Sequence, residues 1–185
     1  MKSRAVSAEA HQYGTRSSEE IRATLLELTR DFTIAASRVQ GVRRIALIGS
    51  LLTTKTHPKD TDLLVTIADD IALGTLARLS RRLKGTAQTR LDSGADVFLA
   101  NTAGEYVGRI CHYRECHPRA LCHARHCGAV PHLADDLDVV TLDPALIAMP
   151  PFELWPAIAV RVPLPADVTQ LLVNPLQAVN RSQPC

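Results

Sequence analysis

The sequence has little of several features that would place it in a functional class at once. Its 185 residues carry a net charge of only +2 and a single tryptophan, and no apolar run follows the two basic residues near the amino terminus. So small a charge does not by itself imply nucleic-acid binding, although the charge is unevenly distributed. Residues 1–16 fit neither a signal peptide nor a membrane anchor, so we expect a loose tail on a soluble, cytoplasmic protein.

The length and the apolar content bound the fold. With 46% hydrophobic residues, the chain can bury one core with an appended lobe. We expect an α/β (α+β) domain in which helices pack on a small mixed sheet. The expected divisions are a tail at 1–16, a core at 17–104, a Cys/His-rich segment at 105–134 and a proline-rich strap at 135–185.

Two apolar strands around a polar loop organise the chain. The first is Ile45–Ile48, and the second, Leu63–Ile67, is opened by Asp60 and Asp62. Because residues at i and i+2 of a strand point the same way, the two carboxylates should project together. Adjacent carboxylates favour a cation between them, and Mg²⁺ prefers oxygen ligands. The alternative is that both aspartates cap a turn after Pro-Lys.

The turn before this loop completes a recognisable pattern. An apolar residue, Gly49 and Ser50 are followed by a spacer and then by Asp60-Thr61-Asp62. Over about residues 20 to 100 the chain thereby resembles the DNA polymerase beta-like nucleotidyltransferase superfamily. The resemblance implies Mg²⁺ on the paired aspartates and a Gly-Ser turn that opens a helix and holds the outer phosphates of a nucleotide. Free N–H groups at a helix start do attract anions.

The resemblance also implies a third carboxylate on a later strand. Asp96 lies inside the apolar stretch Ala95–Leu99, where an acid needs a partner. In the spacer, Lys55 and Lys59 could hold triphosphate or could simply be solvated. Many relatives carry an arginine soon after Gly-Ser, and this chain has leucines there instead.

The flanking segments predict further elements. Ser17 and Glu20 form a capping box for a helix that ends near Gly41. A second helix is expected over Ile71–Lys84, capped by Asp69-Asp70, and a strand or hairpin over Gln88–Leu91 and Ala95–Leu99. The last turns of this second helix carry basic residues, which suit the helix dipole or a polyanionic second substrate. They are Arg78, Arg81, Arg82 and Lys84.

Four of the five cysteines gather between Tyr106 and Gly128, interleaved with four histidines. Such a density of soft ligands predicts a structural Zn²⁺ site, although histidine could replace one or two of the cysteines. The candidate ligands are Cys111, Cys116, Cys122 and Cys127. Disulfides, free thiols and a catalytic zinc stay open as alternatives. Arginines of the same window, such as Arg109, could face a nucleotide or a nucleic acid.

Prolines punctuate the chain after Asp135, which argues against a long helix or a central strand. The apolar residues among them predict an extended strap that wraps the domain or a partner subunit, and the chain could also form a homo-oligomer. Val139–Leu142 could add one strand, and Asp167–Val173 one short helix. Trp155 could stack on a base or serve as a packing anchor.

The implied activity is transfer of a nucleoside monophosphate from a nucleoside triphosphate, such as ATP, to a hydroxyl of a small molecule, RNA or protein. Asp60 and Asp62 would bind one or two Mg²⁺, and Asp96 would bind the second metal or take the proton of the attacking hydroxyl. Ser50 would hold the β- and γ-phosphates. The alternatives are a non-catalytic nucleotide-binding scaffold and a zinc-stabilised nucleic-acid-binding protein.

Overall fold

A seven-stranded mixed sheet forms the centre of the computed structural model, which describes residues 16–112, 130–134, 137 and 140–181. The strand order is β5-β4-β3-β2-β1-β6-β7. The strands are β1 (Val42–Ile48), β2 (Asp60–Ile67), β3 (Gly94–Ala100), β4 (Tyr106–Ile110), β5 (Leu133–Ala134), β6 (Phe152–Trp155) and β7 (Ala159–Val160). The mixed α/β class expected from the sequence is confirmed.

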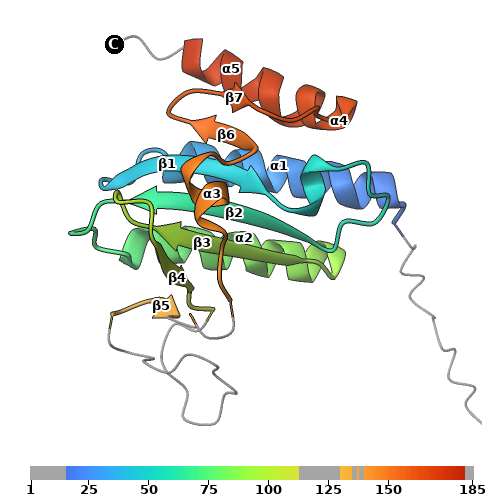
Figure 1. Ribbon diagram of the computed structural model, residues 1–185. Coiled ribbons are helices and arrows are strands. Elements are labelled where there is room, and N and C mark those ends of the chain that lie inside the picture. Colours follow the sequence, from blue (N-terminus) through green and yellow to red (C-terminus); the bar gives the residue numbers. More distant parts are fainter. Residues whose placement is uncertain (1–15, 113–129, 135–136, 138–139, 182–185) are drawn as a thin grey trace, which may run out of the picture.

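Helices cover both faces of this sheet. The longer ones, α1 (Ser18–Ala36) and α2 (Gly74–Leu91), lie behind it in Figure 1, and the short α3 (Pro144–Ala148) crosses in front. The main core, between the sheet and α1 and α2, includes Leu25, Leu63 and Val97. A smaller cluster on the other face contains Ile48, Leu64 and Ile147. Because strand residues alternate between faces, these two clusters tell which way each strand side chain points.

The start of α1 follows the predicted capping box. The Ser17 side chain accepts from the Glu20 N–H at 3.2 Å, and the Glu20 carboxylate accepts from the Ser17 N–H at 2.9 Å. Leu25, Leu26, Phe32 and Ala36 are buried on the face toward the sheet. Gly41, with φ +91°, lies in the turn into β1, where a Cβ would come within 2.9 Å of the Ile71 side chain.

The second helix differs from the prediction. It begins at Gly74 after an N-cap, Leu73, without a side-chain cap, and it runs to Leu91, so Asp69 and Asp70 do not cap it. Gly85 lies inside the helix and does not end it. One exposed glycine costs a helix only about 1 kcal/mol, which the rest of the helix can tolerate. Residues 88–91 are therefore helical and are not the predicted strand. Asp92, in a left-handed conformation with φ 52°, ends α2.

The carboxyl-terminal segment also differs from an extended strap. β6 lies between β1 and β7, which makes it an inner strand, and its Phe152 and Leu154 are buried in the main core. The prolines stand outside it, at positions 150, 151 and 156, so they remove no donor from its ladder. Trp155 packs partly buried against the main core, as an anchor would. Residues 140–143 carry no strand.

A further helical run follows the last strand. α4 (Ala166–Val168) continues through a π-helical stretch, Thr169–Val173, into α5 (Asn174–Arg181), and this run lies along α1 (Figure 1). It is longer than the predicted helix, and Pro175 lies just after the π-helical stretch, where the regular α-helical hydrogen-bond pattern is already interrupted. In the described residues no helix is long and apolar enough to cross a membrane.

Candidate active site

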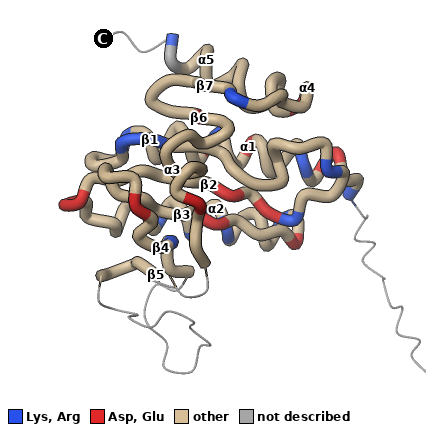
Figure 2. Tube along the Cα trace, viewed as in Figure 1, with Lys and Arg blue, Asp and Glu red and all other residues tan. Residues whose placement is uncertain are grey.

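The three predicted acids lie together on two neighbouring strands. β2 and β3 are parallel, and their register sets Asp62 beside Asp96 and Asp60 beside Gly94. Ala95 and Val97, the chain neighbours of Asp96, face the main core, so Asp96 points to the opposite face of the sheet from α1 and α2. Asp60 and Asp62 share that direction, because Thr61 and Leu63 are fully buried. Figure 2 shows acidic positions at the start of β2, next to a basic position of the preceding loop.

The Gly-Ser turn lies directly against one of these acids. Gly49, which ends β1, has φ +79°, and a Cβ at this position would stand 2.3 Å from Oδ2 of Asp62. Ile48 pairs with Asp62 across the β1–β2 ladder, which fixes this closeness. Only glycine therefore allows the backbone of the turn to approach the Asp62 carboxylate so closely.

Asp62 lies in an unfavourable electrostatic environment. Burial raises its pKa to about 7, and the charges of Asp60 and Asp96 act on the pKa in the same direction. At neutral pH the carboxylate is thus close to half protonated. A cation bound between Asp60 and Asp62 would remove this conflict.

Asp96 differs from Asp62, because the protein supplies its own cations. Its Oδ1 lies 3.2 Å from Nε2 of His112, 3.5 Å from Nζ of Lys84 and 3.7 Å from Nη1 of Arg109. Burial works to raise the pKa of Asp96, but the hydrogen bond from His112 and the charges of Lys84 and Arg109 outweigh it, so the pKa lies below its ordinary value. Asp96 is ionised at neutral pH.

His112 stands between two partners. Its Nε2 is 2.7 Å from Nζ of Lys84 as well as 3.2 Å from Oδ1 of Asp96. One ring nitrogen carries either a proton or a lone pair, so it can donate to the carboxylate or accept from the ammonium, but not both at once. The Nε2 atom of His112 can therefore serve only one of these two partners at a time.

The sequence predicted Lys84 in the last turns of a helix and Arg109 facing a nucleotide or a nucleic acid, and it placed neither beside Asp96. Since α2 continues to Leu91, Lys84 lies in mid-helix, and the dipole of a last turn does not account for it. Arg81, one turn earlier, donates to the Cys111 carbonyl at 3.1 Å. Ala87 and Leu91 continue the apolar helical period of α2. This signal could have predicted that Arg81 and Lys84 face β3 and β4.

The Gly-Ser turn opens only a short 3-10 turn, Ser50–Leu52, and not the longer helix that the resemblance implies. Leu51 and Leu52, which stand where the resemblance implies an arginine, are buried. Arg22 of α1, also buried, donates from Nη2 to the Leu51 carbonyl at 2.7 Å and from Nε to Asp167 of α4. The carboxyl-terminal segment thus anchors the turn.

Ser50 is the polar residue of the turn. Its Oγ is buried and has no hydrogen-bond partner in the described part of the chain. A buried hydroxyl without a partner is costly, and an incoming phosphate oxygen would satisfy it. Lys55 and Lys59 are exposed on the loop before β2, and neither ammonium makes a hydrogen bond or an ion pair with a described residue. The same loop is tied back to α1 by His57, whose ring lies 2.6 Å from the Ser18 hydroxyl.

Of the predicted zinc ligands, only Cys111 lies among the described residues. It is a free, half-buried cysteine whose N–H donates to the His132 carbonyl at 2.8 Å. Cys116, Cys122 and Cys127 lie outside the described residues. Within the described ranges no three His, Cys, Asp or Glu side chains are already arranged to hold a metal ion.

Asp62 gives a direct test of this electrostatic description. The folded pKa is about 7 against an ordinary 3.8, so folding disfavours the charged form, and the destabilisation grows as pH rises from about 4 to about 7 and is then constant. Asp62→Asn should therefore raise the free energy of unfolding by about 1–2 kcal/mol at pH 8, after allowance for solvent screening, and by less at pH 5. We expect a melting temperature about 2–6 °C higher at pH 8.

The exposed Asp69 supplies the control for this measurement. Asp69→Asn should shift the melting temperature by the same small amount at pH 5 and at pH 8. If Asp62→Asn behaved like Asp69→Asn in thermal scans without divalent ions, the described charge conflict would not exist.

Comparison with known proteins identifies no family. No family model, curated protein or solved structure matches the chain. What is established is a mixed α/β domain that brings three carboxylates and a Gly-Ser turn to one end of its sheet.

Proposed function

We propose that the protein is a nucleotidyltransferase that moves a nucleoside monophosphate from a nucleoside triphosphate to a hydroxyl acceptor. One observation carries the proposal: Asp62 stands beside Asp96 on parallel strands while Gly49 holds the Gly-Ser turn against the Asp62 carboxylate. The turn and the acids, which the resemblance treats as one site, are adjacent in space. The acceptor would be a small molecule, an RNA or a protein.

The donor set suits Mg²⁺. Asp60 and Asp62 offer only carboxylate oxygens, and burial, together with the charges of Asp60 and Asp96, raises the pKa of Asp62, so a bound cation would favour its charged form. Mg²⁺ is commonly bound by one or two carboxylates together with substrate phosphates and water, so two aspartates suffice. When bound, the ion would stabilise charge on the attacking and leaving oxygens of the in-line displacement.

The turn would hold the nucleotide. The buried Oγ of Ser50 would donate to a β- or γ-phosphate oxygen, and Gly49 would let the phosphate approach the backbone. Lys55 and Lys59 lie on the loop between the turn and β2, from which their long side chains could reach the triphosphate. Positioning and charge stabilisation supply most of the catalysis in phosphoryl transfer, and these groups provide both.

Asp96 would act on the acceptor. The hydrogen bond from His112 and the charges of Lys84 and Arg109 keep this carboxylate ionised, so it can accept the proton of the attacking hydroxyl, although its lowered pKa makes it a weak base. The same cations compete with a second Mg²⁺ at this position, so both roles expected for Asp96 stay in the proposal.

A structural Zn²⁺ held by Cys111, Cys116, Cys122 and Cys127 remains part of the proposal. Thiolates are the preferred ligands of structural zinc, and such a site would tie down a segment with few apolar residues. Cys111 directly follows β4, so the segment leaves the sheet next to Asp96 and its partner His112.

A non-catalytic nucleotide-binding scaffold is the second candidate, and the neutralisation of Asp96 by Lys84 and Arg109 favours it. A carboxylate held in ion pairs is less available to bind metal or substrate. Both candidates require Mg²⁺-dependent nucleotide binding, and only transfer of the nucleotide separates them.

Nucleotide binding is tested by thermal stability. Mg²⁺ with ATP at about one hundred times its dissociation constant should stabilise the wild type by about 2.7 kcal/mol, which is about 5–10 °C in melting temperature. The gain should vanish in Asp60→Asn/Asp62→Asn and persist in Asp69→Asn. A full gain in the double variant would place nucleotide binding elsewhere.

A further inference from the structure

A wide hollow of the described structure lies away from the acids. It has a volume of about 650 Å³ and is lined by the end of α1, the turn into β1 and the start of α2. β1 begins here, where Val42 pairs with Ile67, whereas Asp62 pairs with Ile48 at the other end of β1. The hollow is therefore separate from the candidate active site.

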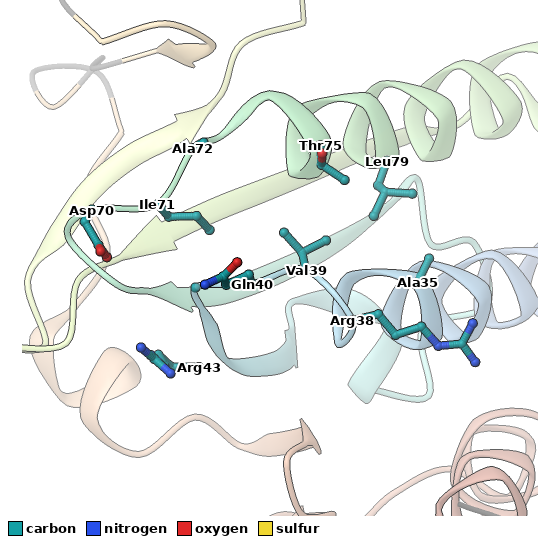
Figure 3. A pocket seen from close by; sticks show the side chains of 11 residues that line it. Ala35, Arg38, Val39, Gln40, Arg43, Asp70, Ile71, Ala72, Thr75 and Leu79 are labelled. Carbon is teal, nitrogen blue, oxygen red and sulfur yellow. The ribbon is translucent and has the colours of Figure 1, made fainter.

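Apolar and polar side chains both line this hollow. Figure 3 shows Val39, Ile71 and Leu79 around the space, with the side chains of Arg38 and Arg43 farther out. Such a volume is typical of a pocket for a small organic group. The apolar side chains suit a flat, uncharged ring.

The hollow continues along the two helices. A second hollow of about 290 Å³ shares Ala35 and Leu79 with the first and lies between α1 and α2. We call the two together the interhelical groove. Its α2 side carries Arg82, Thr86 and Arg90, which line the second hollow. Side chains four residues apart share a helix face and are about 6 Å apart along it.

The arginines of the groove are available for a ligand. Among the described residues, no side-chain hydrogen bond or ion pair engages Arg38, Arg43, Arg82 or Arg90, and all four are exposed. Two acids oppose them. Asp70 is exposed, and Asp31 is already paired with Arg30 at 2.9 Å. The groove keeps an excess of positive charge along its length.

We propose that the interhelical groove binds single-stranded RNA, with a base in the larger hollow and the phosphates along the arginines of α2. A single strand combines flat bases with regularly spaced phosphates, which match the apolar side chains of the larger hollow and the arginines of α2. A duplex keeps its bases stacked inside and has no ring to place in the hollow. Gln40, Thr75 and Thr86 line the groove with polar side chains that can bond to ribose hydroxyls.

The groove and the acids lie on opposite faces of the sheet, so this binding does not depend on nucleotidyl transfer. Asp60→Asn/Asp62→Asn should bind RNA as tightly as the wild type. The failure of one proposal would leave the other standing.

The test is fluorescence anisotropy with a labelled RNA of about 12 nucleotides, which is within the site size of known single-strand binders. Arg82→Glu/Arg90→Glu should weaken binding at least about tenfold at low salt and should reduce the slope of log K against log salt by about 1–2. Arg181→Glu, a charge reversal at an exposed arginine of α5, is the control and should leave the affinity within about twofold. Arg82→Gln/Arg90→Gln repeats the test by removing the two positive charges without adding negative ones.

Any of four results would overturn the proposal. Three of them are no RNA binding by the wild type at about 50 mM salt, an equal loss in Arg181→Glu, and DNA of the same sequence bound as tightly as RNA. Retained affinity in both groove variants, at unchanged melting temperature, would also overturn it. Selective loss in the groove variants with preference for RNA would support it.

Discussion

Replacing Gly49 with alanine is expected to reduce nucleotidyl transfer about a hundredfold, because the new Cβ would stand 2.3 Å from Oδ2 of Asp62. The Asp62 carboxylate can rotate away from this clash, but it then leaves the position in which it would hold Mg²⁺. The φ of +79° adds backbone strain for any residue other than glycine. We expect a loss of about 1–2 kcal/mol in the free energy of unfolding, measured by urea denaturation.

Gly85 offers a matched control. It lies in the middle of α2, and a Cβ added there would meet no atom within 4 Å. Gly85→Ala should therefore stabilise the protein by about 0.5–1 kcal/mol and leave transfer unchanged. If Gly49→Ala kept full activity, the contact between the turn and Asp62 would have no functional role.

The second large effect is expected at Arg22. Arg22→Met removes the partner of Asp167 and of the Leu51 carbonyl, and Arg22 is only 8% exposed. Breaking a buried ion pair from one side typically costs about 3–5 kcal/mol, and Asp167 is partly exposed, so we expect a loss of about 2–4 kcal/mol. The melting temperature should fall by about 5–15 °C.

Arg30→Met is the control for this variant, because Arg30 lies on the same helix and pairs with an exposed neighbour, Asp31, at 2.9 Å. Its loss should cost less than about 0.5 kcal/mol. Equal melting temperatures for the two variants would show that Arg22 does not anchor the turn through the carboxyl-terminal segment.

The sequence predicted the elements whose signals are local. Ser17 and Glu20 are a capping box because both bonds form within one helical turn, and the alternation around Asp62 determines which way it points. The neighbouring position of Asp96 was expected only from the resemblance. The parallel pairing of β2 with β3 provides it in the structure.

The predictions that were wrong concern elements in which tertiary contacts outweigh the local conformational preference of the sequence. Gly85 was an obvious place to end a helix, yet Leu83, Ala87 and Leu91 are buried against the main core, and that burial keeps α2 helical past the glycine. In the same way, the prolines around Phe152 suggested an extended strap that wraps the domain or a partner subunit. Their positions flank β6, and the buried Phe152 and Leu154 make it an inner strand.

The cations around Asp96 could not be assigned from sequence spacing. Lys84, Arg109 and His112 come from α2, from β4 and from the residues after it, and they meet only because these elements converge on β3. The contact of Arg22 with Asp167 joins residues 145 positions apart and had no local signal either.

The central claim is nucleotidyl transfer at the Asp60, Asp62 and Asp96 site. It is tested most directly by incubating the protein with each α-³²P-labelled nucleoside triphosphate, Mg²⁺ or Mn²⁺, and a host-cell extract, beside Asp60→Asn/Asp62→Asn and Asp69→Asn. We predict label on a macromolecule or a small acceptor with the wild type and Asp69→Asn, and none with the double variant. Nucleotide binding without any transfer of label, or equal transfer by the double variant, would contradict the account.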